Sequence, residues 1–262
     1  MLFRSGVPDV VAGAPGYNNG AGRAIVFSGK DARVLLSLDG EKAGDAFGST
    51  LAGSREGRLR ILMVGAPGAG PRGTGRTYVY KGMSAKPAFV LDSDETGGAF
   101  GGMFMSVLGD VNGDKRDDLY VSDWANSANA RGTGRAYVYS GVDGKLLHTL
   151  TGEARSDGFG IGVADAGDVD GDGRQDLIIG AWQHERAALS GGKTYLYSGR
   201  SGKLLRTITG RTPGDTFGFD TTNLGDVDGD GAVDFLVTSA WSGVNGFQSG
   251  RLFVIAGEPV KQ

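Results

Sequence analysis

The chain has 262 residues, enough to bury a large core, and 27 Lys and Arg residues against 30 Asp and Glu give it a net charge of −3. This balance offers no basic surface for nucleic acid or anionic lipid, so partners of these kinds are not expected. The absence of cysteine excludes disulfides and thiolate zinc sites. No apolar run reaches 18 residues and the first ten residues are not a signal peptide, so the sequence predicts no transmembrane segment and no signal peptide within this chain.

Internal repeats dominate the sequence. The pair Phe-Gly occurs four times at intervals of 53 to 59 residues, beginning at Phe47, Phe100, Phe159 and Phe217. A second phrase, in forms such as GRAYVYSG and GKTYLYSG, occurs five times. The 49 glycines indicate many turns, and no segment has sustained helical periodicity. The repeats therefore predict an all-β array.

Each repeat is predicted to contain four strands. A short strand follows Phe-Gly, and after it come an acidic loop, an apolar run such as DLIIGAW, an alternating strand such as KTYLYSG and a more polar strand such as KLLRTITG. Four antiparallel strands repeated radially form a β-propeller blade. A solenoid would need a shorter period, and separate sandwiches would need linkers that this chain lacks. The predicted single propeller, 1–262, divides into a partial blade at 1–46, blades at 47–99, 100–158 and 159–216, and a partial blade at 217–262.

Three features of the repeats carry a family resemblance. They are the Phe-Gly opening, the loop D-x-[DN]-G-D-x-x-x-D, and the Gly-Ala-Pro tail of VAGAPG (11–16) and VGAPG (64–68). Together they resemble FG-GAP repeats, the blades of the integrin alpha-subunit propeller and of bacterial integrin-like surface proteins, and the phrasing is similar to the bacterial members. The resemblance implies a calcium-bearing propeller, extracellular or at the cell surface, that serves adhesion or protein contacts. Because propellers of the integrin type have seven blades, the resemblance also implies either missing blades or domains of a longer chain, or an unusual short variant.

Three acidic loops occur in register and suit a hard cation. Oxygen ligands at loop positions 1, 3, 5 and 9, with a backbone carbonyl at position 7, can surround one ion, and calcium accepts six to eight oxygens in loose geometry. The alternative is a solvated Asp-Gly turn, but three copies in register favour a metal site. The predicted ligands, including the position-7 carbonyls, are Asp110, Asn112, Asp114, Arg116 and Asp118; Asp168, Asp170, Asp172, Arg174 and Asp176; and Asp226, Asp228, Asp230, Ala232 and Asp234.

Two of the three loops are expected to bind calcium strongly and the third more weakly. The weaker loop, 110–118, has Asn112 in place of a carboxylate and Lys115 where the others have Gly173 and Gly231.

Two other blades are predicted to hold no ion. In the second blade, the ligand positions carry Gly53, Arg55, Gly57 and Ile61. In the first, Asp9 matches position 9 of a loop whose earlier residues are 1–8.

The loops opposite the acidic ones are predicted to form a contact surface for a protein or carbohydrate ligand. Antiparallel order places the connections between second and third strands, and between blades, at that end. Trp124, Trp182 and Trp241 share one repeat position there. They are interpreted either as ligand anchors or, preferably, as wedges between blades.

Catalysis has little support in this sequence. The chain has only two histidines, His148 and His184, and no nucleophile, metalloprotease or phosphate-loop motif, so no catalytic residue is predicted. The leading hypothesis is a noncatalytic calcium-binding propeller for extracellular adhesion or protein contact. The alternative is an accessory or substrate-binding domain of an exported hydrolase or lyase that acts on polysaccharide or lipid.

Overall fold

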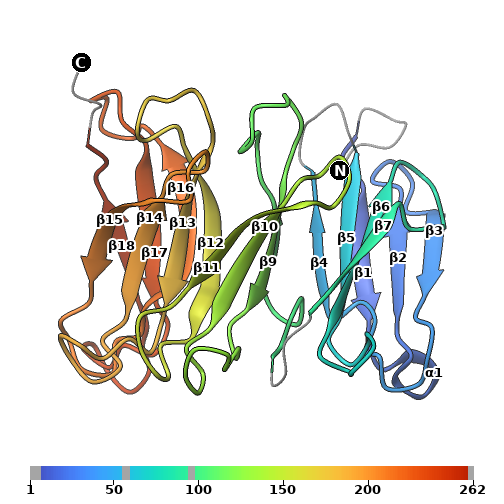
Figure 1. Ribbon diagram of the computed structural model, residues 1–262, viewed down its shortest axis with the longest axis horizontal. Coiled ribbons are helices and arrows are strands. Elements are labelled where there is room, and N and C mark those ends of the chain that lie inside the picture. The colour runs from blue at the N-terminus through green and yellow to red at the C-terminus, as the bar shows by residue number, and fades with distance from the viewer. Residues whose placement is uncertain (1–6, 55–59, 94–97, 259–262) are drawn as a thin grey trace.

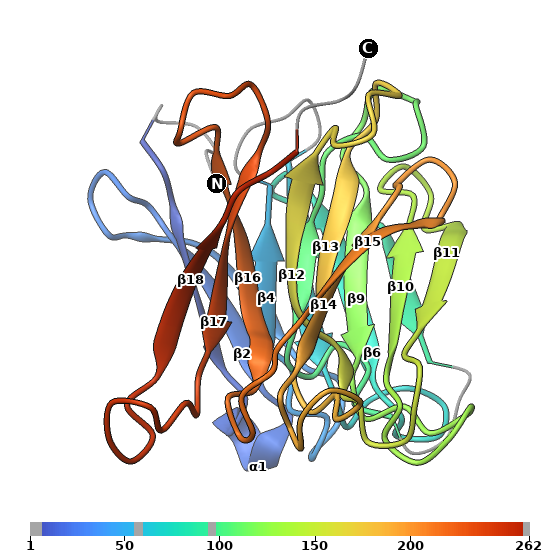
Figure 2. The ribbon, with the colours of Figure 1, turned by 90° about the vertical axis from the view of Figure 1, so that its left-hand side faces the viewer.

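A computed structural model describes residues 7–54, 60–93 and 98–258 of the chain. In these ranges it has 18 β-strands and one four-residue helix, α1 (Tyr17–Gly20). The strands form five antiparallel sheets arranged as an arc, with the first and last sheets at its two ends (Figures 1 and 2). The predicted all-β propeller of about five blades is confirmed.

The sheets follow chain order, and neighbouring strands in the sequence are neighbours in each sheet. The first sheet has β1 (Val10–Ala14), β2 (Arg23–Phe27) and β3 (Val34–Asp39). The second has β4 (Thr50–Gly53), β5 (Ile61–Ala66), β6 (Arg76–Lys81) and β7 (Phe89–Asp92). The third has β8 (Met105–Val107), β9 (Leu119–Asp123), β10 (Arg135–Tyr139) and β11 (Leu146–Thr151). The fourth has β12 (Phe159–Gly167), β13 (Asp176–Ala181), β14 (Lys193–Tyr197) and β15 (Leu204–Thr209). The last has β16 (Phe217–Gly225), β17 (Asp234–Ser239) and β18 (Arg251–Ile255).

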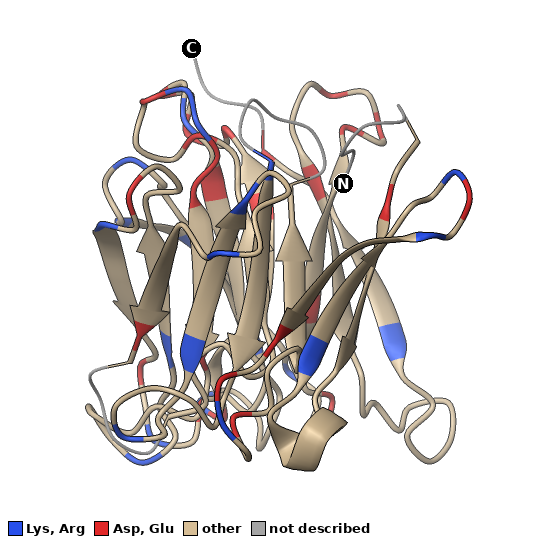
Figure 3. Ribbon diagram, turned by 90° about the vertical axis from the view of Figure 1, so that its right-hand side faces the viewer, with Lys and Arg blue, Asp and Glu red and all other residues tan. Residues whose placement is uncertain are grey.

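The core is divided among the spaces between consecutive sheets. Four hydrophobic clusters fill these spaces, and each draws on the two sheets that flank it. The strands β5, β9 and β13 are buried at every position, because each has a neighbouring sheet on both faces. Charged residues lie mainly in loops and at strand ends (Figure 3). Within the described ranges, no helix is long and apolar enough to cross a membrane.

A close backbone approach joins each sheet to the next. Phe159 opens the fourth sheet, and its N–H donates a hydrogen bond to the carbonyl of Thr133 in the third (3.0 Å). A Cβ at the adjacent Gly134 would lie only 2.1 Å from the Phe159 carbonyl oxygen. The Phe159 ring is fully buried and meets the Tyr195 ring edge to face at 5.3 Å. The repeated Phe-Gly and Gly-Arg pairs are therefore the two halves of one junction between sheets.

The same junction recurs at three other places along the arc. In each, a Cβ on the glycine would lie 2.0 to 2.3 Å from the carbonyl oxygen of the next sheet's phenylalanine. The pairs are Gly22 with Phe47, Gly75 with Phe100, and Gly192 with Phe217.

We expect Gly134→Ala to destabilise the fold strongly, because the new methyl group meets backbone that has no room to move. Gly214→Ala is the matched control, since Gly214 also has a positive φ (75° against 82°) but no atom within 4 Å of its Cβ position. Both variants lose about 1 kcal/mol from the left-handed conformation. Gly134→Ala should lose about 1–3 kcal/mol more from overpacking. Equal free energies of unfolding for the two variants, measured by urea denaturation, would contradict this junction.

Candidate metal centre

The three acidic loops lie at one end of the sheets, opposite α1 (Figure 1). They connect β8 to β9, β12 to β13 and β16 to β17. In the 168–176 loop, the two carboxylate oxygens of Asp168 accept hydrogen bonds from the N–H groups of Asp172 (2.9 Å) and Gly173 (2.8 Å). Asp226 accepts the same two bonds in the 226–234 loop, from Asp230 and Gly231. The aspartate at position 1 therefore holds its loop in a tight turn through these backbone hydrogen bonds.

Loop position 6 needs a left-handed backbone in all three copies. Gly173 and Gly231 have φ values of 82° and 88°, and Lys115 takes the same conformation at 63°. A non-glycine residue is strained there by about 1–2 kcal/mol. The 110–118 loop keeps the shape of the other two despite this residue, and the N–H of Lys115 donates to Asp110 as its counterparts do (2.9 Å).

Carboxylates converge in two of the loops. The ligand atoms of Asp168, Asp170 and Asp176 all lie within 4.8 Å of one another. Asp226, Asp228 and Asp234 form the corresponding group in the next sheet. These donors are oxygen atoms only, at positions 1, 3 and 9, and such a set fits calcium better than a soft metal.

The remaining predicted side-chain ligands serve the turn. Asp172 and Asp230, at position 5, accept hydrogen bonds from the N–H groups at position 7, Arg174 (3.0 Å) and Ala232 (2.8 Å). In the 110–118 loop, Asp114 does the same for Arg116 (2.8 Å). Within the described ranges, the carboxylates of this third loop form no group of the kind seen in the other two.

The aspartate at position 9 has a second role that the sequence analysis did not predict. Asp176 is buried, and it accepts hydrogen bonds from Val169 (2.8 Å) and Asp170 (3.2 Å) in its own loop. Its other oxygen accepts from the N–H of Gly199, in the turn between β14 and β15 (2.8 Å). Asp176 therefore joins the acidic loop to the turn between β14 and β15 of the same sheet.

We call this contact the position-9 clamp, and it recurs in other sheets. Its donor is the backbone N–H of the glycine that closes the phrase GRAYVYSG or its equivalent. The pairs are Gly29 with Asp9 (3.1 Å), Gly141 with Asp118 (3.1 Å) and Gly257 with Asp234 (2.8 Å). This glycine recurs in the sequence after the third predicted strand of each repeat, and that recurrence could have indicated the contact. In the second sheet, which has Ile61 at position 9, the closing glycine, Gly82, instead donates to the backbone carbonyl oxygen of Arg60 (2.9 Å). The Ile61 N–H itself donates to the hydroxyl oxygen of Ser54 (3.0 Å).

Burial raises the pKa values of Asp118 and Asp176 to about 6, against the opposing effect of their backbone hydrogen bonds. A cation beside either carboxylate would favour its charged form.

The second sheet keeps its shape without an acidic loop. Gly53 ends β4 and Ile61 begins β5, while the predicted positions Arg55 and Gly57 lie outside the described residues. The residues predicted to precede Asp9 in its loop include 1–6, which are also outside the described ranges.

At the opposite end, the three tryptophans differ in exposure. Trp182 is buried, and its ring meets the rings of Phe219 (5.7 Å) and Trp241 (4.8 Å) of the last sheet, as expected of a wedge. Trp241 itself is 48% exposed, and Trp124 is half-buried.

Two polar side chains in the loops at this end are buried. The amide of Asn126 donates to Asp123 (3.0 Å), and the His184 Nδ1 lies 3.1 Å from an oxygen of the buried Asp157. These contacts hold loops together, so neither side chain is available as a surface group.

Comparison with known proteins agrees with this geometry. A family model described as an FG-GAP-like repeat matches residues 168–237, which contain both carboxylate groups in full. The chain is a β-propeller that contains an FG-GAP-like repeat. Integrin alpha-4 of Xenopus laevis is 29% identical to the propeller over 248 residues, covering 87% of this chain and 23% of that protein. Integrin alpha-3 of Cricetulus griseus is 33% identical over 176 residues, covering 60% and 16%.

A solved structure described as the Dos1 propeller shares the fold. Its TM-score is 0.53 at 11% identity, and the match covers 88% of this propeller and 49% of that chain. The propeller spans less than a quarter of the integrin relatives it matches.

Asp170→Ala and Asp176→Ala should separate the metal role from the clamp. Asp170 lies in the carboxylate group but holds only one hydrogen bond within its loop, so its loss should weaken calcium binding with a small change in calcium-free stability. Asp176→Ala also leaves three backbone donors without their acceptor, and should cost about 3 kcal/mol or more without calcium. Isothermal titration calorimetry measures calcium binding, and urea denaturation measures the calcium-free stability.

The control for these variants is Ile61→Ala, at position 9 of the second sheet. It should cost about 2–5 kcal/mol as a core truncation and leave calcium binding unchanged. If Asp170→Ala binds calcium as the wild-type chain does, Asp170 is not a ligand.

Proposed function

We propose that this chain is a noncatalytic, calcium-stabilised propeller that mediates adhesion or protein contact outside the cell. The observation that carries the proposal is the pair of three-carboxylate groups at matching positions of two consecutive sheets. Calcium held by Asp168, Asp170 and Asp176 would neutralise a loop whose carboxylates otherwise repel at short range. The similarity to integrin alpha subunits favours a contact role over a catalytic one.

The contact surface is proposed at the end opposite the acidic loops. There, the loop between β17 and β18 exposes three large apolar side chains, Trp241 (48%), Val244 (55%) and Phe247 (93%). An open hollow lined in part by Phe219 and Asn245 adjoins them. Exposed aromatic side chains of this kind anchor protein partners.

Calcium should raise the melting temperature of the chain through the 168–176 and 226–234 loops. An ion that binds only the native state adds about 2.7 kcal/mol per site at a hundredfold excess over Kd. Thermal unfolding followed by circular dichroism, in EDTA and in millimolar calcium, measures this effect. Identical melting curves in the two conditions would contradict the proposal that these loops bind calcium.

Binding to immobilised partners should separate the proposed contact role from polysaccharide recognition. We expect retention by members of a panel of purified extracellular matrix proteins, and not by a panel of polysaccharides. Replacing Trp241 and Phe247 by serine should reduce retention at least tenfold, while Val34→Ser, an exposed apolar site in β3, should not. Retention by polysaccharides alone would contradict the proposal.

A further inference from the structure

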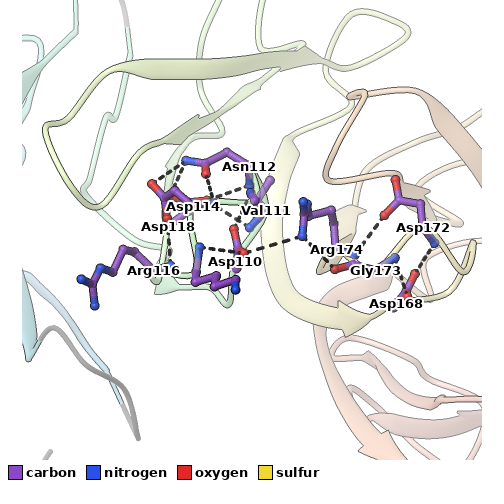
Figure 4. Close-up of polar contacts among 12 residues, drawn as sticks. Asp110, Val111, Asn112, Asp114, Arg116, Asp118, Asp168, Asp172, Gly173 and Arg174 are labelled. Carbon is purple, nitrogen blue, oxygen red and sulfur yellow. Dashed lines mark hydrogen bonds and ion pairs between the residues drawn. The ribbon is translucent and has the colours of Figure 1, made fainter.

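The side chain of Arg174 leaves its own loop and lies over the neighbouring one. Its Nη1 is 3.9 Å from a carboxylate oxygen of Asp110, which holds position 1 of the 110–118 loop (Figure 4). A Cβ added to Gly113, at position 4 of that loop, would lie 2.4 Å from Nη2 and 2.6 Å from Cζ of Arg174. The guanidinium group therefore rests directly on the backbone of the 110–118 loop, beside its first acidic residue.

Backbone contact fixes this placement. The N–H of Gln175 donates to the carbonyl oxygen of Asp110 (3.0 Å), so position 8 of one loop is bonded to position 1 of the other. The Arg174 guanidinium also donates to the carbonyl oxygen of Gly173 (3.2 Å). Arg174 thus has a backbone carbonyl within the 168–176 loop and a positive charge within reach of the 110–118 loop.

A second donor group lies inside the 110–118 loop. The side-chain amide of Asn112 donates to Asp114 (3.3 Å) and to Asp118 (3.2 Å), so it occupies acceptor oxygens that a cation would otherwise use. The neutral amide therefore supplies hydrogen-bond donors to the acidic side chains of this loop, and the guanidinium supplies positive charge.

The next pair of loops lacks this arrangement. Ala232 stands at the position of Arg174 in the 226–234 loop, and its methyl group carries no charge. Asp168, the equivalent of Asp110, has no ion pair among those formed by the described residues. Position 3 of the 110–118 loop is Asn112, so this loop lacks one of the three carboxylates that form the groups in the 168–176 and 226–234 loops.

We propose that Arg174 is the internal counter-cation of the 110–118 loop and decides which loops of this chain take calcium. Its guanidinium neutralises Asp110 and repels a second cation from the same loop, while its carbonyl remains available to the 168–176 loop. The weaker calcium binding predicted for the 110–118 loop then has a cause outside that loop. The inference rests on the proposed calcium binding by the other two loops.

The test is calcium titration of the full chain by isothermal calorimetry, with Arg174→Ala as the main variant because it reproduces the Ala232 position. We expect a third ion per chain, or a third site tightened at least tenfold, with the affinity of the 226–234 site unchanged. Adding Asp110→Asn to Arg174→Ala should abolish the additional calcium binding, which would place that binding in the 110–118 loop. Arg174→Gln, which keeps the length of the side chain without its charge, replaces the alanine variant if that variant does not fold.

Arg116→Ala is the matched control. It removes the same charge from position 7 of the 110–118 loop itself, and Figure 4 shows the Arg116 side chain pointing away from Asp110. This variant should not gain an ion. Equal titrations for Arg174→Ala and the wild-type chain, or an equal gain in Arg116→Ala, would overturn the inference. A wild-type chain that binds no calcium would refute the proposed function, whereas a gain confined to Arg174→Ala would still support the role of Arg174.

Discussion

The structure depends on the close backbone approach between a glycine before the third strand of one sheet and the phenylalanine that opens the next. At Gly134 and Phe159 the two backbones are too near for any side chain between them. The contact sets the spacing of the sheets, and the buried ring then fills the space beside it. The clusters between sheets can pack only because this spacing is fixed. The regular placement of the loops at each end follows from the same contact.

The closing glycine of the same repeated phrase performs a different task at the other end of the third strand. Gly199 donates its N–H to Asp176, and a Cβ there would lie 1.8 Å from the Gln175 carbonyl oxygen. One strand with a glycine at each end therefore contacts both the next sheet and its own acidic loop. The acidic loops are held in register by the sheets, which explains why carboxylate groups appear at matching positions in consecutive sheets.

The fold could be predicted from the sequence because its determinants are periodic. The Phe-Gly pairs and the glycine-bounded strands repeat at nearly constant intervals, and the acidic loops repeat with them. Contacts between different repeats could not be predicted in this way. Nothing in the sequence indicates that Arg174 reaches Asp110, because the direction of a long side chain depends on the packing of two sheets. The burial of Asn126 and His184 could not be predicted either, since polar residues in loops are usually exposed.

The position-9 clamp separates the strand pairing of a sheet from the carboxylate content of its loop. In the first sheet, Asp9 forms the clamp with Gly29, and in the second the N–H of Gly82 donates to the Arg60 carbonyl oxygen in place of a carboxylate, yet both sheets have the same strand pairing as the others. The residues that distinguish a loop rich in carboxylates from one without them lie mostly at exposed positions 1 and 3. Substitutions at these positions can therefore change the carboxylate content of one loop at a time while the strand pairing stays the same. A repeat chain of this design can change the negative charge of each loop one residue at a time.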